Sequence, residues 1–229
     1  MSHEGKRPKQ SKPVQDIGLS DILEFLKDSS DFSFEMRVLK QISNLGFQCS
    51  HSGTYYDPIT QKPRQYDIRA KKGQGNQSLS LSVECKSLSK AAPLLVSTTP
   101  RNLNDSYHSL LVMTEENTLP DVKLVSGFGT FYYGGYSGKK MNQVRRNDDG
   151  SLKGKDDEVF ERLSQAQSSA FDLIQTAATV RDPNQTAAVV PMLVIPDETL
   201  WCVEYDSEGN PSEPKQRDEV SFFLGQPFL

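Results

Sequence analysis

Cysteine and histidine are scarce in this chain, and each occurs only three times among 229 residues. Cys49, Cys85 and Cys202 lie far apart, without C-x-x-C spacing and without a histidine at metal-ligand spacing, so nothing indicates a zinc site. Isolated cysteines in an odd number suit a reducing compartment, and we therefore expect a cytoplasmic protein. The sequence also lacks G-x-S-x-G and cysteine–histidine signatures, which leaves catalysis through a covalent intermediate without support.

Long apolar runs are absent as well. No stretch approaches the roughly 20 apolar residues that a membrane-spanning helix needs, so we expect no membrane partner. Residues 1–15 carry several basic side chains with no apolar core after them, which predicts a disordered tail rather than a secretory signal. Residues 16–229 are expected to form a single domain, because one elaborated domain often has this length.

An excess of positive charge is also missing, because the net charge is -4. Any surface that binds phosphates must therefore be a local concentration of Lys and Arg. One stretch combines stacking rings with such charge: Phe128, Phe131, Tyr132, Tyr133 and Tyr136, followed by Lys139, Lys140, Arg145 and Arg146. It fits a nucleic-acid contact surface, and a packed hairpin followed by a charged loop explains it equally well.

The elements that are present alternate between helical and extended patterns. Apolar spacing predicts helices at 17–27, 31–46 and 156–180, and period-two alternation predicts strands at 47–56, 65–72, 78–86, 109–114, 188–196 and 199–206. Pro191 indicates that its strand lies at a sheet edge or is broken there. The order is helix, three strands in a meander, a long excursion, helix and strand, so we predict an α/β fold with a mixed central sheet flanked by helices.

Four [D/E]-x-K triplets occur in the chain, and only Glu84-Cys85-Lys86 closes a long alternating strand. Side chains two residues apart on a strand point to the same face, so Glu84 and Lys86 are neighbours. Cys85 then points into the opposite, apolar layer. In the preceding strand, a hairpin about Gly75 brings Asp67 opposite Glu84, whereas a slip of one residue would put the two carboxylates on opposite faces.

Two carboxylates at close range repel each other unless a cation lies between them. Oxygen ligands of this kind suit Mg²⁺ or Mn²⁺, which keep several waters and engage the phosphate oxygens of a substrate. An ammonium beside a metal-bound water can orient the nucleophile and offset the charge that grows on the phosphate. Asp67, Glu84 and Lys86 are therefore candidate residues of a phosphodiesterase site.

These residues resemble the PD-(D/E)xK nuclease superfamily, which has the restriction-endonuclease-like fold. The resemblance implies an αβββαβ core with a helix acid, a strand Asp and a (D/E)-x-K element, matched here by Glu35 in FSFEMR, Asp67 in QYDIRA and VECKS. It places residues 87–155 in an insertion. It departs from the family pattern at Tyr66, where the pattern has a proline.

The resemblance further implies a Mg²⁺-dependent endonuclease acting on DNA, with Mn²⁺ as a substitute. Asp67, Glu84 and the Cys85 carbonyl would bind the metal, Lys86 would position the water, and Glu35 would assist. Analogy suggests a restriction or host-defence enzyme, and a homodimer stays open. Gln165 on the long helix is a further candidate, or part of a solvated face. The alternative is a catalytically inactive module of the same fold that binds nucleic acid or serves as an assembly subunit.

Overall fold

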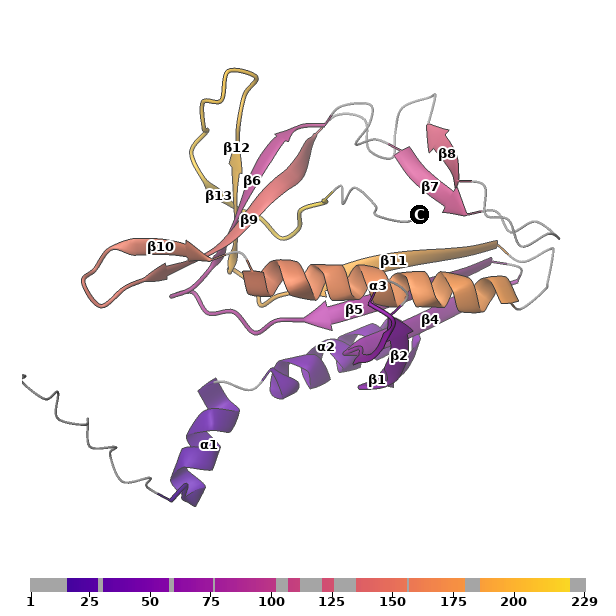
Figure 1. Ribbon diagram of the computed structural model, residues 1–229, viewed down its shortest axis with the longest axis horizontal. Coiled ribbons are helices and arrows are strands. Elements are labelled where there is room, and N and C mark those ends of the chain that lie inside the picture. The colour runs from indigo at the N-terminus through magenta and orange to yellow at the C-terminus, as the bar shows by residue number, and fades with distance from the viewer. Residues whose placement is uncertain are drawn as a thin grey trace, which may run out of the picture.

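The computed structural model in Figure 1 has three helices and several sheets within the part of the chain that it describes, which confirms the predicted mixed α/β class. It describes residues 16–28, 31–57, 60–75, 77–101, 107–111, 121–125, 135–155, 157–179 and 186–222. The predicted tail at 1–15 lies outside these ranges. No described helix is long and apolar enough to cross a membrane.

A four-stranded sheet combines three strands of residues 48–85 with one strand from residues 186–194. In chain order, the four strands and the two helices that pack on them are α2 (Phe32–Asn44), β1 (Gln48–His51), β4 (Ile68–Gln74), β5 (Gln77–Cys85), α3 (Asp157–Thr179) and β11 (Thr186–Val194). The strand order is β1-β4-β5-β11, with antiparallel pairing from β1 to β5 and parallel pairing of β11 with β5. β11 lies at the sheet edge, as Pro191 predicted.

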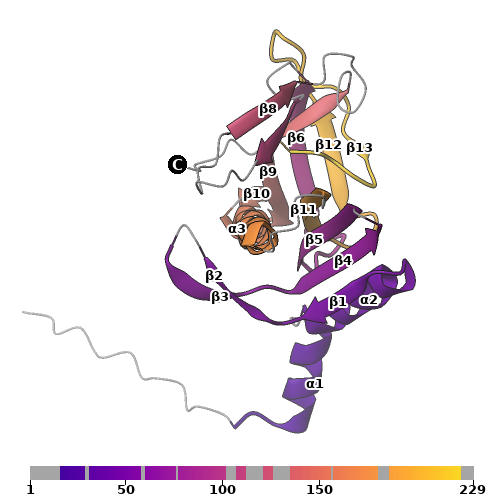
Figure 2. The same cartoon turned by 90° about the vertical axis from the view of Figure 1, so that its right-hand side faces the viewer.

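The two faces of this sheet carry different chemistry, and Figure 2 shows α2 and α3 on opposite sides of it. The face toward α2 is apolar, because Ile68, Val83 and Cys85 pack there against the stripe that the helical spacing predicted. That stripe consists of Phe34, Val38 and Ile42. The alternate residues of the same strands point toward α3, where Arg69 pairs with Asp172 at 2.9 Å.

A hairpin inserted between β1 and β4 extends the molecule beside α3. It consists of β2 (Thr54–Asp57) and β3 (Lys62–Gln65). The sequence predicted one strand over 47–56 followed by a turn, but Ser52 has a φ of 54° and divides that strand in two. Part of the turn predicted at residues 57–64 is β3, so that prediction was wrong at residues 62–64.

A second sheet uses residues on both sides of α3. Its order is β10-β9-β6-β12-β13, with β6 (Leu94–Pro100), β9 (Tyr136–Arg146), β10 (Leu152–Lys155), β12 (Leu200–Glu204) and β13 (Lys215–Gln216). The segment predicted as an insertion, 87–155, therefore supplies β6, β9 and β10, and the C-terminal part completes the sheet. β12 pairs in parallel with β6.

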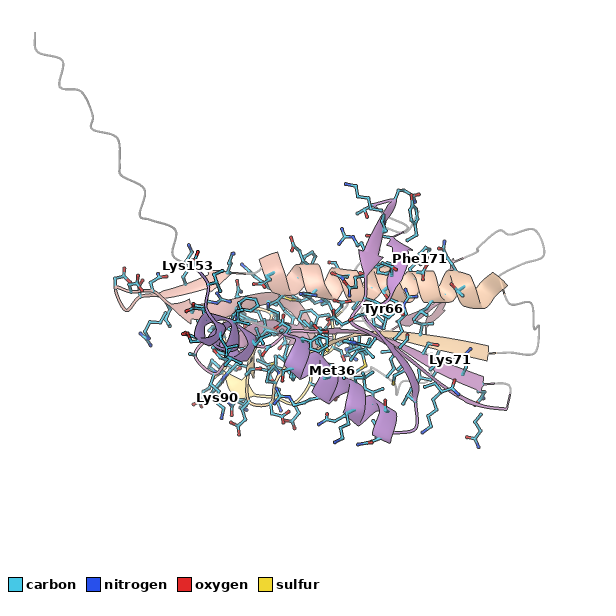
Figure 3. The ribbon with its side chains drawn as sticks, turned by 90° about the horizontal axis from the view of Figure 1, so that it is seen from below. Met36, Tyr66, Lys71, Lys90, Lys153 and Phe171 are labelled. Carbon is cyan, nitrogen blue, oxygen red and sulfur yellow. The ribbon has the colours of Figure 1, made fainter. Side chains whose placement is uncertain are left out.

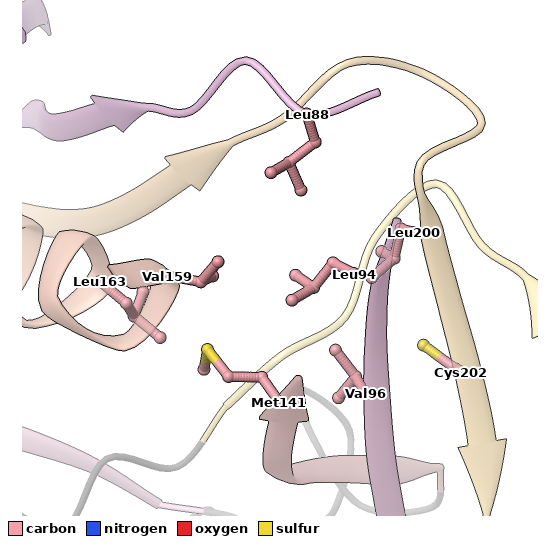
Figure 4. Close-up of a cluster of buried hydrophobic side chains, with 8 residues drawn as sticks. All are labelled: Leu88, Leu94, Val96, Met141, Val159, Leu163, Leu200 and Cys202. Atoms are coloured by element: carbon pink, nitrogen blue, oxygen red, sulfur yellow. The ribbon is translucent and has the colours of Figure 1, made fainter. Parts of the chain in front are cut away.

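α3 joins the two sheets, because its first half packs into the core of the second one. Figure 4 shows that core, made of Leu88, Leu94, Val96, Met141, Val159, Leu163, Leu200 and Cys202. Like the β2–β3 hairpin, α1 (Leu19–Asp28) and the antiparallel pair of β7 (Tyr107–Leu111) and β8 (Asp121–Val125) lie outside both sheets. α3 is thus fixed over the face of β5 that carries Glu84.

Candidate active site

Asp67 and Glu84 meet where β4 begins and β5 ends. Ile68 pairs with Val83 in the antiparallel ladder, so the next residues outward are Asp67 and Glu84, which is the register that the sequence predicted. The Asp67 backbone N–H donates to Glu84 Oε1 at 3.4 Å. The Cys85 N–H donates to Asp67 Oδ2 at 2.8 Å. Each carboxylate therefore has one oxygen held by the backbone of the other strand.

Glu84 is the more deeply buried of the two carboxylates, with no exposed surface, whereas Asp67 is 9% exposed. Burial, and then the charge of Asp67, raise the pKa of Glu84 to about 8. The nearby Arg162 and the backbone hydrogen bond lower that pKa, but by less. Glu84 is consequently a carboxyl group that needs positive charge beside it to stay ionised at neutral pH.

Arg162 of α3 supplies part of that charge in this structure, but the pKa of Glu84 is still about 8 with Arg162 beside it. Its Nη1 lies 3.3 Å from Glu84 Oε2 and 3.7 Å from Asp67 Oδ1, so one nitrogen faces both carboxylates. Burial lowers the pKa of Arg162, but Asp67 and Glu84 raise it by more, and the net shift is upward. The guanidinium therefore stays charged and neutralises part of the carboxylate pair.

Lys86 follows Glu84 but forms its described ion pairs with other carboxylates. Its Nζ donates to Glu158 Oε1 at 2.6 Å and to Asp31 Oδ2 at 3.4 Å. The hydrogen bond from Lys86 is the main cause that lowers the pKa of Glu158. Asp31 precedes α2 as a cap residue, yet its side chain makes no cap hydrogen bond and accepts from the Ser87 N–H at 2.9 Å instead.

Glu35 makes its described side-chain contact with His51 rather than with Asp67 or Glu84. Its Oε2 is 3.0 Å from His51 Nε2, and His51 closes β1 opposite Ile68. Cys85 is fully buried in the core beside α2, as predicted, and burial is the main cause that raises the pKa of its thiol. The roles predicted for Glu35 and for the Cys85 carbonyl stay predictions, because no contact described here tests them.

The structure adds three charged residues that sequence reasoning missed: Asp31, Glu158 and Arg162. Arg162 lies seven residues before Ser169, which puts both on one face of a helix, but this spacing points to Arg162 only once Ser169 is known to face the sheet. Arg69 of β4 donates to Ser169 on that face. Gln165 serves a different purpose, since its side chain donates to the Gln65 carbonyl and so ties the β2–β3 hairpin to α3.

The described residues contain no group of three or more His, Cys, Asp or Glu side chains placed to hold a metal ion. The carboxylate pair is a set of two, which Mg²⁺ can use because it commonly takes one or two carboxylates together with waters and substrate phosphates. Searches found no matching family model, no matching curated protein and no matching solved structure. The site must therefore be interpreted from its own geometry.

Proposed function

We propose that this chain is a Mg²⁺-dependent endonuclease that acts on DNA, with its site at Asp67, Glu84 and Lys86. The observation that carries the proposal is the convergence of two carboxylates at a strand end, each with one oxygen directed at a positive charge. The first sheet and the two helices that pack on it support the proposal. Their order along the chain, α2-β1-β4-β5-α3-β11, agrees with the αβββαβ order of the PD-(D/E)xK superfamily. A restriction-endonuclease-like core is part of the same proposal.

The donor set fits a hard divalent cation. Asp67 Oδ1 and Glu84 Oε2 would hold the ion, with the Cys85 carbonyl as the third protein ligand, and the backbone N–H groups fix the other carboxylate oxygens. When bound, the ion would lower the pKa of a water and polarise the phosphate. The burial of Glu84 keeps its side chain in one orientation, so the chain itself preorganises the pair.

Lys86 would act on the attacking water and on the charge that develops at the phosphate. Asp31 and Glu158 hold its ammonium, and its side chain is 13% exposed, so the group is kept in position. Glu158 is much more exposed than Asp31 and can give way to a substrate phosphate. The resemblance implies products with a 5′-phosphate and a 3′-hydroxyl.

DNA is supported as the substrate by a basic β-ribbon. β9 and β10 pair so that Arg145 lies directly opposite Lys153, and both residues are exposed. Like charges in register destabilise a ladder unless a polyanion offsets them. Figure 3 shows Lys153 on the ribbon, at the same end of the molecule as the start of α3. Arg145 also lowers the pKa of Glu158, so the ribbon adjoins the site.

Some parts of the predicted DNA surface lie outside the described residues: Phe128, Phe131, Tyr132 and Tyr133. Tyr136, which begins β9, is 41% exposed and can still stack on a base. A role in restriction or host defence, a homodimer and a cytoplasmic location come from the sequence expectations alone, and they remain proposals.

A second candidate is a catalytically inactive module of the same fold that binds nucleic acid or serves as an assembly subunit. One observation favours it: Arg162 pairs with Glu84, and Lys86 pairs with Glu158, so both basic residues already have acidic partners within the protein. In that case the ion pairs would serve only to hold α2, β5 and α3 together.

Cleavage of supercoiled plasmid DNA, measured in Mg²⁺ and again in excess chelator, distinguishes the two candidate functions. The enzyme proposal predicts nicking or linearisation that is lost in Asp67→Asn, Glu84→Gln and Lys86→Gln. The matched controls are Glu213→Gln and Lys215→Gln, which alter an exposed triplet of the same pattern and should cleave like the wild type. Cleavage that survives in the three site variants would reject the assignment. DNA binding without any cleavage would support the inactive module.

A further inference from the structure

The four carboxylate oxygens of Asp67 and Glu84 fall into two pairs with different partners. The backbone holds Glu84 Oε1 and Asp67 Oδ2, and the remaining oxygens, Glu84 Oε2 and Asp67 Oδ1, both face Arg162 Nη1. These remaining oxygens are the ones that a shared cation would use. Arg162 Nη1 thus places positive charge beside both carboxylates at once.

The surroundings also allow the guanidinium to leave. The Arg162 side chain is 31% exposed, whereas Glu84 is fully buried, so the arginine approaches the pair from the solvent side. Its Nη2 lies 3.9 Å from Asp31 Oδ2, which offers a second acidic partner close by. A long flexible side chain can exchange between such partners, but the two strand carboxylates cannot follow it.

We propose that Arg162 is a built-in counter-cation, which holds the Asp67 and Glu84 pair when no metal is bound and which a divalent cation must displace. The inference rests on the proposed function, because that function supplies the metal. Arg162 is a positioning residue in this account and not a catalytic one. It keeps the carboxylates facing each other before the metal arrives, and it competes with the metal for the same oxygens.

The rival explanation is a plain structural ion pair that anchors α3 to the sheet. Arg69 provides a matched control, because it also joins the sheet to α3, through Ser169 at 3.0 Å and Asp172 at 2.9 Å. Arg69 makes no described ion pair with Asp67 or Glu84. Loss of either arginine should weaken the packing of α3, but only loss of Arg162 should change how the carboxylate pair binds a cation.

The test is Mn²⁺ binding to the full chain, measured by calorimetry or by the electron paramagnetic resonance signal of free Mn²⁺. Arg162→Gln should bind Mn²⁺ about tenfold more tightly than the wild type, a coupling of ordinary size for two linked sites. Its melting temperature should fall without metal and recover when Mn²⁺ is added. Arg69→Gln should lower the melting temperature and leave the Mn²⁺ affinity unchanged.

Equal or weaker Mn²⁺ binding by Arg162→Gln would overturn the inference. If the wild type still cleaves plasmid DNA in that case, the proposed function stands. Tighter binding without cleavage by the wild type would keep the inference and reject the enzyme. No binding by either protein would reject both. If Arg162→Gln does not fold, Arg162→Lys gives a second measurement, because one ammonium reaches both carboxylates less well and should also tighten Mn²⁺ binding.

Discussion

The buried carboxyl of Glu84 should make the stability of the metal-free protein depend on pH in a direction opposite to that of most acidic residues. Its pKa in the folded protein is about 8, against 4.5 as the ordinary value. Between these values the folded state binds more protons than the unfolded state, so stability is present at low pH and is lost as the pH rises through about 8. One such proton changes the free energy of unfolding by up to about 1.4 kcal/mol per pH unit.

Glu84→Gln removes this ionisation and keeps the shape of the side chain. We expect its stability to be close to that of the wild type near pH 5, where folded Glu84 is protonated, and its advantage over the wild type to grow as the pH rises to 8. The assay is urea unfolding in excess chelator at pH 5, 6.5 and 8, followed by the fluorescence of Trp201, the single tryptophan of the chain. Exposed Glu213 provides the control variant, Glu213→Gln, which should follow the wild type at every pH.

The reasoning would be refuted by a difference between Glu84→Gln and the wild type that stays constant from pH 5 to pH 8. A wild type that becomes more stable over this range relative to Glu84→Gln would refute it more strongly. That outcome would mean that Arg162 stabilises the ionised carboxylate by more than burial and Asp67 destabilise it.

Three further predictions test the packing and the DNA surface. Ile68→Ala should lower the free energy of unfolding by about 2–5 kcal/mol, because Ile68 has no exposed surface, and the urea midpoint should shift without a change in slope. Gly53→Ala should lower the melting temperature, because a Cβ there would collide with the Tyr66 ring and hydroxyl. Lys153→Gln should reduce by about one the slope of log affinity for DNA against log salt concentration, without lowering the melting temperature, because it also removes the repulsion from Arg145.

The local features of the candidate site could be predicted because strand geometry determines them. Period-two alternation put Cys85 in the core and Glu84 on the opposite face, and the short turn at Gly75 placed Asp67 beside Glu84. The same rule put Lys86 on the face of Glu84, but it gave no information on the partners of its long side chain. Those partners are Asp31, just before α2, and Glu158 of α3, both far away in sequence.

The other features depend on how distant segments meet. Arg162 looks like any charged residue of an exposed helix surface until α3 is placed over the end of β5, and its spacing from Ser169 only becomes informative then. The second sheet has the same origin, because the parallel pairing of Leu94 with Leu200 joins strands about a hundred residues apart. Local propensity carries no information on such pairings, since they depend on packing within the complete fold.

A crystal of the protein soaked in Mn²⁺ tests the central claim most directly, through the anomalous scattering of the metal. The account predicts one strong peak about 2.1 Å from both Asp67 Oδ1 and Glu84 Oε2, with the Arg162 guanidinium moved away from that position. A map at saturating Mn²⁺ with no peak between these carboxylates, and with Arg162 still paired to Glu84, would contradict it.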